Sequence, residues 1–285
     1  MKKITTIAIA LTIIIASLAS CSSSKGGDLT SINNYVTPNY TVKVDTGTFT
    51  FAEGQGDTAI ITKYSGLYEE HEVTIPKTIE FQGGTRIVTA IDDEAFYYCT
   101  SVTGVVIPDT VETIGNNAFT GCLKLTSVNI PDAVTQIGNS AFMGCTALKS
   151  VNFSSASNLT QIGDYAFADC SELTSITLPS KLEKIGNAAF WQCKKITKVE
   201  MPEAVKSIGK MAYYLCTGLN TDGCIVLTAG IEEIGDFAFS STNKEYIKAP
   251  VGSYAYDYVQ AMIEKDFPEE TESSDESESS EKSEG

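Results

Sequence analysis

Histidine is almost absent from this sequence of 285 residues, since His71 is the only one. A single imidazole excludes a metal site built from several histidines and a catalytic pair that depends on histidine. Basic residues are also scarce: 20 lysines and arginines face 36 acids, which gives a net charge of −16. A chain this acidic lacks the surface that neutralises phosphates, so we exclude nucleic acid as a partner.

Sequence motifs for catalysis and metal binding are missing as well. The chain has no Gly-x-Ser-x-Gly nucleophile elbow, and its eight cysteines include no Cys-x-x-Cys pair of the kind that binds zinc. We therefore predict that the protein is not an enzyme and that it holds neither a metal nor a cofactor.

The first residues have the features of a bacterial export signal. Lys2 and Lys3 precede an apolar stretch, and small residues lead to Cys21. The ending Leu-Ala-Ser-Cys resembles the bacterial lipoprotein signal, which implies that residues 1–20 are removed and that Cys21 carries the lipid. An ordinary signal peptide that contains a cysteine is the alternative. Residues 21–39 start with Ser and Gly and are predicted to form a flexible tether.

The far end, residues 268–285, contains eight acids and one lysine. Serine fills most of the other places, and nothing apolar is present that would offset the entropy of ordering the segment. We predict a disordered acidic tail. A role in binding calcium is the alternative.

A repeated pattern fills most of the sequence between these ends. The string Ile-Gly-(Asn/Asp)-x-Ala-Phe occurs five times, with two degenerate copies, and the copies begin at Ile91, Ile114, Ile137, Ile162, Ile185, Ile208 and Ile234. Successive copies lie 23, 23, 25, 23, 23 and 26 residues apart. Cysteine follows the aromatic residue by three places in six copies, and a short alternating run ends in proline after four of them.

The residues of one unit predict its structure. Val128 and Ile130 alternate with polar residues, which is the period of a strand with one buried face, and Pro131 ends this strand. Gly138 permits a backbone turn, and Asn139 is placed to cap a short helical turn. Because one unit buries too little apolar surface to fold alone, we predict that about seven units stack into a solenoid of parallel strands.

The complete pattern resembles the BspA-like leucine-rich repeat, a short repeat of bacterial surface proteins. The resemblance covers residues 73–250. It implies an α/β solenoid of leucine-rich-repeat type, with parallel strands on the concave face and short helical turns on the convex face. Departures mark irregular repeats: Ser154 replaces the expected proline, three extra residues precede Ile225, and Thr242 replaces the last cysteine.

The flanks of the repeats are interpreted as caps, which a solenoid needs in order to cover its two apolar ends. Residues 40–72 contain alternating segments around a Gly-rich turn, and we predict an N-terminal β cap of two strands. Residues 251–267 resemble the terminal segment common in this family. There we predict an amphipathic helix with Tyr254, Tyr258 and Met262 on its apolar face.

Two columns of repeated side chains invite a chemical interpretation. The six cysteines of the repeats are predicted to be buried free thiols, with disulfides between neighbouring units as the alternative, because stacked strands lie ~4.8 Å apart. Cys224 lies outside this column and is expected to be the most exposed. The Asn and Asp residues after Ile-Gly supply too few carboxylates for calcium, so helix capping explains them better.

The candidate binding site is the outward side of the strands. We predict that its small polar residues lie side by side on the concave face, and they are Ser127, Asn129, Ser150, Asn152, Ser175, Thr177, Lys198 and Glu200. They include no aromatic cluster of the kind that dominates tight interfaces, so a merely solvated face is the alternative. Exposed aromatic side chains are expected on the convex side, at Tyr97, Tyr98, Trp191 and Tyr214.

These features lead to a functional hypothesis. We expect a non-catalytic protein, favoured as a monomer, that is held outside the cytoplasm at the bacterial membrane or cell surface by lipid on Cys21. Its solenoid would bind host or microbial surface proteins or glycans, and the family resemblance implies adhesion. The alternative is a cell-envelope scaffold without a host ligand.

Overall fold

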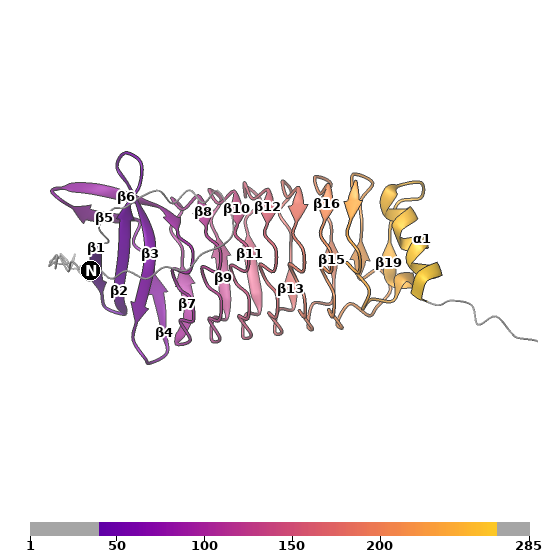
Figure 1. Cartoon of the computed structure of the whole chain (residues 1–285), viewed down its shortest axis with the longest axis horizontal. Coiled ribbons are helices and arrows are strands. Elements are labelled where there is room, and N and C mark those ends of the chain that lie inside the picture. The colour runs from indigo at the N-terminus through magenta and orange to yellow at the C-terminus, as the bar shows by residue number, and fades with distance from the viewer. Residues whose placement is uncertain (1–39, 267–285) are drawn as a thin grey trace, which may run out of the picture.

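The computed structural model of the protein describes residues 40–266, which form an elongated solenoid (Figure 1). The chain winds through about eight turns, with a strand-rich cap at one end and a helix at the other. Each regular turn contributes two strands and one run of tight turns, and each of these segments pairs with its counterpart in the next repeat. The predicted solenoid of parallel strands is confirmed.

The strands expected from the sequence form the first ladder, and they pair in parallel. Its first part consists of β4 (His71–Thr74), β7 (Val102–Val106), β9 (Ser127–Ile130), β11 (Ser150–Phe153) and β13 (Ser175–Ile176). Its second part consists of β15 (Val199–Glu200), β17 (Ile225–Val226) and β19 (Ile247–Lys248). The two parts are separate sheets, so the ladder is interrupted between β13 and β15.

A second ladder of strands was not expected from the sequence. Its members are β8 (Thr113–Ile114), β10 (Gln136–Ile137), β12 (Gln161–Ile162), β14 (Lys184–Ile185), β16 (Ser207–Ile208) and β18 (Glu233–Ile234). They pair in parallel, so that Ile137 lies between Ile114 and Ile162. The isoleucine that opens each motif is therefore a strand residue whose side chain enters the core.

The residues after each Ile-Gly pair form tight turns rather than the short helices expected on the convex side. Between residues 40 and 266 the helical elements are α1 (Tyr254–Asp266) and the 3-10 turn η1 (Lys244–Tyr246). Ser140 has a φ of 54°, which is incompatible with a continuous right-handed helix. Its amide donates instead to the Asp164 carbonyl of the next repeat over 2.7 Å, and that of Phe142 to Ala166 over 2.7 Å. The turns thus form a third ladder.

The glycine of each motif allows two repeats to approach closely, which corrects the expectation that it serves a turn. A Cβ atom on Gly138 would lie 2.5 Å from the carbonyl carbon of Gly115 in the preceding repeat. A Cβ atom on Gly163 would lie 2.7 Å from the amide nitrogen of Asn139. Neighbouring backbones are in contact at this position, so no side chain fits there.

The core consists of columns of equivalent side chains, one from each repeat. Aromatic rings of successive repeats stack with centroid distances of 4.7–5.6 Å, and the column comprises Phe96, Phe119, Phe142, Phe167, Phe190, Tyr213 and Phe239. All of these side chains are buried. Burying one large apolar side chain is worth about 1.5–3 kcal/mol. Each ring is covered on both faces only when both neighbouring repeats are present.

The N-terminal cap contains three antiparallel strands where the sequence suggested two. They are β1 (Tyr40–Val44), β2 (Gly47–Glu53) and β3 (Thr58–Gly66). β3 then pairs in parallel with β6 (Gly84–Ile91), which forms a hairpin with β5 (Thr78–Phe81) and also joins the second ladder. Tyr40, Phe51 and Phe81 pack together, with 4.0 Å between the Tyr40 and Phe81 ring centroids.

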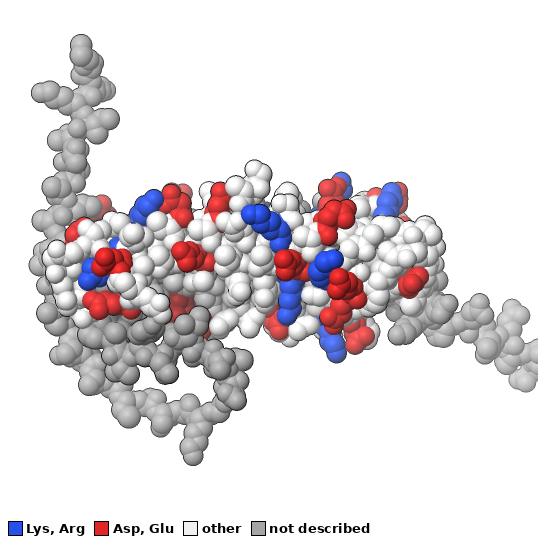
Figure 2. Space-filling view, turned by 90° about the horizontal axis from the view of Figure 1, so that it is seen from above, with Lys and Arg blue, Asp and Glu red and all other residues white. Residues whose placement is uncertain are grey.

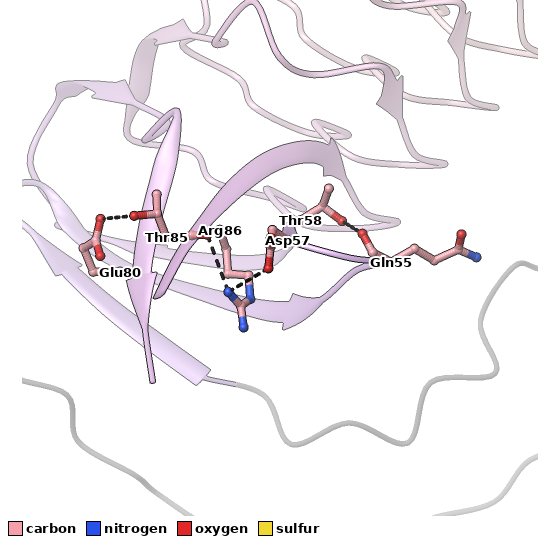
Figure 3. A network of polar contacts seen from close by, with 6 residues as sticks. All are labelled: Gln55, Asp57, Thr58, Glu80, Thr85 and Arg86. Atoms are coloured by element: carbon pink, nitrogen blue, oxygen red, sulfur yellow. Dashed lines mark hydrogen bonds and ion pairs between the residues drawn. The ribbon is translucent and has the colours of Figure 1, made fainter. Parts of the chain in front are cut away.

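Polar contacts link the two hairpins of this cap (Figure 3). The Arg86 guanidinium lies 3.3 Å from the Asp57 carboxylate, which joins β6 to the turn between β2 and β3. Within the turn, the Thr58 hydroxyl donates to the Gln55 carbonyl over 2.8 Å. This turn connects two strands, so it serves the cap rather than a ligand.

Helix α1 covers the last repeat. Ala255 and Val259 are its buried residues, and the Tyr258 hydroxyl donates to the Gly235 carbonyl over 3.2 Å. Tyr258 and Met262 pack partly against the core, as expected, but the Tyr254 side chain is exposed. The apolar face is therefore rotated from the predicted one: Ala255 and Val259 are buried, while the Tyr254 hydroxyl accepts the amide of Ile234 over 3.4 Å.

We predict that Gly138→Ala destabilises the protein by about 1–3 kcal/mol, because the new methyl group would overlap the backbone of Gly115. Chemical denaturation measures the loss. Gly144→Asn is the matched control: Gly144 has a φ of 70°, which asparagine tolerates, and the nearest atom to its Cβ position is 3.9 Å away. Equal stability of Gly138→Ala and the parent would contradict the close approach.

Candidate binding faces

The predicted lipidation site, Cys21, lies outside the residues that the structure describes, as do the predicted tether and the acidic tail. Within residues 40–266 no helix has both the length and the apolar composition needed to cross a bilayer. The candidate binding surfaces all belong to the solenoid.

Six of the predicted binding residues form a continuous polar surface, which we call the strand face: Ser127, Asn129, Ser150, Asn152, Ser175 and Thr177. Ser127, Ser150 and Ser175 are register partners in β9, β11 and β13. Asn129 and Asn152 are also partners, and the amide of Asn152 donates to the Asn129 carbonyl oxygen over 2.8 Å. The structure thus brings the serines and asparagines together as predicted, and Thr177 is exposed directly after β13.

The other two predicted residues, Lys198 and Glu200, lie beyond the interruption of the first ladder, on and beside β15. Their side chains form an ion pair at 2.5 Å. A shallow hollow of about 490 Å³ adjoins them, and its lining comprises Thr197, Lys198, Thr221, Asp222, Gly223, Cys224, Val226 and Lys248. The extra residues before Ile225 indicated an irregular repeat, but the hollow itself was not predicted from the sequence.

Ion pairs connect neighbouring repeats in the C-terminal half of the solenoid. The pairs are Lys195–Glu172, Lys206–Glu232, Lys210–Asp236 and Lys248–Asp222, at 2.7–3.5 Å. On the face shown in Figure 2, basic and acidic side chains likewise lie next to one another over this half. Each exposed pair contributes about 0–1 kcal/mol. The strand face of the preceding repeats is neutral by contrast.

The asparagine and aspartate column connects repeats and does not cap helices, which corrects the sequence interpretation. The Asn116 side-chain oxygen accepts the amide of Asn139, and that of Asn139 accepts the amide of Asp164, both over 2.8 Å. The column continues through Asn187 to the amide of Lys210. Lysine carries no acceptor, so the series ends there. Each of these side chains uses one oxygen to accept a backbone amide of the next repeat.

The cysteine column is structural. Each of its buried thiols donates to the carbonyl of the aromatic residue in the preceding repeat at 3.0–3.3 Å, as Cys145 does to Phe119. The cysteines of residues 40–266 are all free, as predicted, but Cys99 in the first repeat is only half-buried. Burial raises the pKa of the Cys216 thiol to about 12. Cys224 is buried as well, which makes the expectation of exposure wrong: its thiol faces the Tyr246 carbonyl.

No group of three or more His, Cys, Asp or Glu residues in the described part of the chain is arranged to hold a metal ion. The surface residues that the structure brings together are neutral serines, threonines and asparagines or paired charges. Such groups donate and accept hydrogen bonds, and their arrangement suits recognition of a polar surface.

Comparison with protein families supplies the deciding observation. Residues 89–220 and 152–262 match the family described as BspA type leucine rich repeat region, in six copies. The chain belongs to the BspA-type leucine-rich repeat family. A search of curated proteins found no match.

Solved structures of other leucine-rich repeat proteins are similar to this BspA-type chain. The leucine rich repeat protein of T. pallidum is 27% identical, with a TM-score of 0.61 over 76% of this chain and 92% of that one. A leucine rich cell surface protein of Faecalibacterium prausnitzii is 29% identical (TM-score 0.59; 73% and 54% covered). A leucine-rich repeat protein of Bacteroides ovatus is also 29% identical (TM-score 0.58; 70% and 57% covered). The chain thus spans little more than half of the last two proteins.

We predict that the BspA-type repeats lose stability between about pH 9 and about pH 12. Because the pKa of Cys216 is higher in the folded protein, the unfolded chain releases its proton first as the pH rises. Below the lower pKa the free energy of unfolding is unaffected by the thiol. Between the two pKa values it decreases by about 1 kcal/mol per pH unit for each such thiol. Urea titrations under reducing conditions at pH 8, 10 and 11 measure the decrease.

The matched variant is Cys216→Ser, whose hydroxyl keeps a donor for the Phe190 carbonyl but does not titrate in this range. It should lose less stability than the parent over the same interval. Identical pH dependence in the two proteins would contradict the role of the buried thiol.

Proposed function

We propose that this protein binds proteins or glycans of a host or a neighbouring microbe through the strand face, and that it does so while anchored to the bacterial membrane by lipid on Cys21. The observation that carries the proposal is the in-register row of serine and asparagine side chains on β9, β11 and β13, in which Ser150 is half-buried and the others are exposed. Solenoids offer extended surfaces of this kind to partners.

The chemistry of the strand face supports a polar ligand. Its side chains carry hydroxyl and amide groups, which both donate and accept hydrogen bonds. The side chains of Ser127, Ser150 and Ser175 are short, so a ligand can approach the strand backbone closely along this column.

Two further observations support the surface location. The ending Leu-Ala-Ser-Cys at Cys21 resembles a lipoprotein signal, and one of the similar structures is a leucine rich cell surface protein. Adhesion is the function that these features favour. A scaffold that only spaces components of the envelope would show no saturable binding to host or microbial surface molecules.

We expect a glycan and matrix-protein array probed with the full chain to identify a ligand whose binding is lost in the double variant Asn129→Lys/Asn152→Glu. The opposite charges keep the two partners attracted while they change the surface. The control is Gln136→Lys/Gln161→Glu, which places the same pair on register partners of the second ladder. Absence of any saturable ligand, or equal loss of binding in both variants, would contradict the role of the strand face.

The anchor is tested by Cys21→Ala. In a bacterial host that processes lipoproteins, the parent should partition with membranes and incorporate a labelled fatty acid, because acyl chains bind bilayers by ~0.8 kcal/mol per buried methylene. The variant should appear in the soluble fraction. Cys99→Ser serves as the control for loss of a cysteine. Equal partition of parent and Cys21→Ala would overturn the anchoring proposal.

A further inference from the structure

The face built by the tight turns carries exposed aromatic side chains that the fold does not need. We call this surface the turn face, and it comprises the residues 91–99, 114–122, 137–145, 162–170, 185–193, 208–216 and 234–242. Tyr98, Tyr165, Met211 and Phe237 are 57%, 45%, 41% and 58% exposed. Tyr97 is exposed beside Tyr98, while Trp191 and Tyr214 are half-buried. The aromatic residues expected on this side are therefore present, two of them only in part.

The backbone conformation at these positions is unfavourable for bulky side chains. Tyr98, Tyr165, Met211 and Phe237 have φ angles of 54–60°, in the left-handed region. Tyr165, Met211 and Phe237 occupy one position of the repeat, where the second copy has Asn117, whereas Tyr98 occupies the position that Gly121 has in the next copy. Asparagine and glycine are among the residues that tolerate this conformation. A bulky side chain that is strained and exposed does not stabilise the fold, and such residues often mark functional surfaces.

Three of these side chains lie along one line of the turn face, with Ala188 between Tyr165 and Met211, while Tyr98 lies in the first repeat. The amide of Tyr165 donates to the Asn187 carbonyl, that of Ala188 to Lys210, and that of Met211 to Asp236. These bonds align Tyr165, Ala188, Met211 and Phe237 in four successive repeats. Tyrosine, tryptophan, phenylalanine and methionine are the residue types enriched at protein interfaces.

The charge of the turn face identifies the chemistry of a partner. It carries six carboxylates and one lysine, a net charge of −5, and these residues are Asp92, Asp93, Glu94, Asp164, Asp169, Asp236 and Lys210. Asp93 and Asp164 keep their charge while they accept amides of the next repeat, and Asp236 pairs with Lys210 at 3.5 Å. The remaining residues between 91 and 242 carry ten acids and eight lysines. The turn face is thus both more acidic and more aromatic than the other faces of the solenoid.

We propose that the turn face binds an arginine-rich segment of a partner protein. Guanidinium groups stack on aromatic faces and also bind carboxylates through two parallel hydrogen bonds, whereas an ammonium group has no planar face to stack. The interaction is separate from the ligand of the strand face, because the two surfaces consist of different residues. Failure of one proposal leaves the other intact.

The test uses the full chain and fluorescent oligo-arginine and oligo-lysine peptides of equal length, with binding measured by anisotropy at physiological ionic strength. The aromatic variant combines Tyr98→Asn, Tyr165→Asn, Met211→Asn and Phe237→Asn. Asparagine tolerates the backbone conformation, and the net charge is unchanged. We expect this variant to bind oligo-arginine about tenfold more weakly or worse, and the parent to prefer oligo-arginine to oligo-lysine.

Charge variants separate this surface from the general acidity of the chain. The first carries Asp93→Asn, Glu94→Gln, Asp169→Asn and Asp236→Asn on the turn face. The second, a matched control, carries Glu112→Gln, Asp132→Asn, Glu183→Gln and Glu233→Gln elsewhere on the solenoid. The first should weaken binding of oligo-arginine at least severalfold more than the second.

Three results would overturn the proposal: an aromatic variant that binds as tightly as the parent, charge variants that lose affinity equally, or equal binding of the two peptides. Circular dichroism and denaturation of each variant verify the fold. If the aromatic variant does not fold, the proposal is tested by the two charge variants and by the preference for oligo-arginine over oligo-lysine.

Discussion

Hydrogen bonding between one repeat and the next is the interaction on which the whole structure depends. It runs along three lines, through the proline-terminated strands, through the two-residue strands and through the tight turns. Side chains reinforce it: asparagine and aspartate oxygens accept amides, and thiols donate to carbonyls. A single repeat would keep the bonds within its own tight turns but would lose every bond to its neighbours. The flat stacking of the phenylalanine rings follows from the same alignment.

The sequence was sufficient to predict those elements whose pattern extends over several residues or recurs in every repeat. The alternation of Val128 and Ile130 before Pro131 predicted β9, and the regular spacing of the motifs predicted the stacking. The second ladder could not be found in this way, because two residues such as Gln136 and Ile137 are too short to show a period. The turns were mistaken for helices for a related reason: Ala141, Phe142 and Cys145 follow helical spacing, but the positive φ of Ser140 is not visible in sequence.

The candidate site was predictable only in part. The position of a residue within its repeat does not show whether the strands of two neighbouring repeats pair. The serines and asparagines of the strand face were placed correctly because every regular strand has the same outward positions. Lys198 and Glu200 occupy those positions too, yet the ladder is interrupted before β15. The exposure of Cys224 was misjudged, because the extra residues in its repeat turn the thiol toward the Tyr246 carbonyl. Irregular repeats are where local patterns lose predictive power.

The series of side-chain acceptors that ends at Lys210 bears on how such a protein changes length. Each repeat with asparagine or aspartate offers a side-chain oxygen to the next repeat and a backbone amide to the preceding one. A duplicated repeat inserted within the series therefore meets compatible neighbours on both sides. Recombination between similar stretches of the gene can therefore lengthen or shorten the rod without building a new interface. Beyond Lys210 this compatibility is lost, which leaves the end next to α1 as the part least open to duplication.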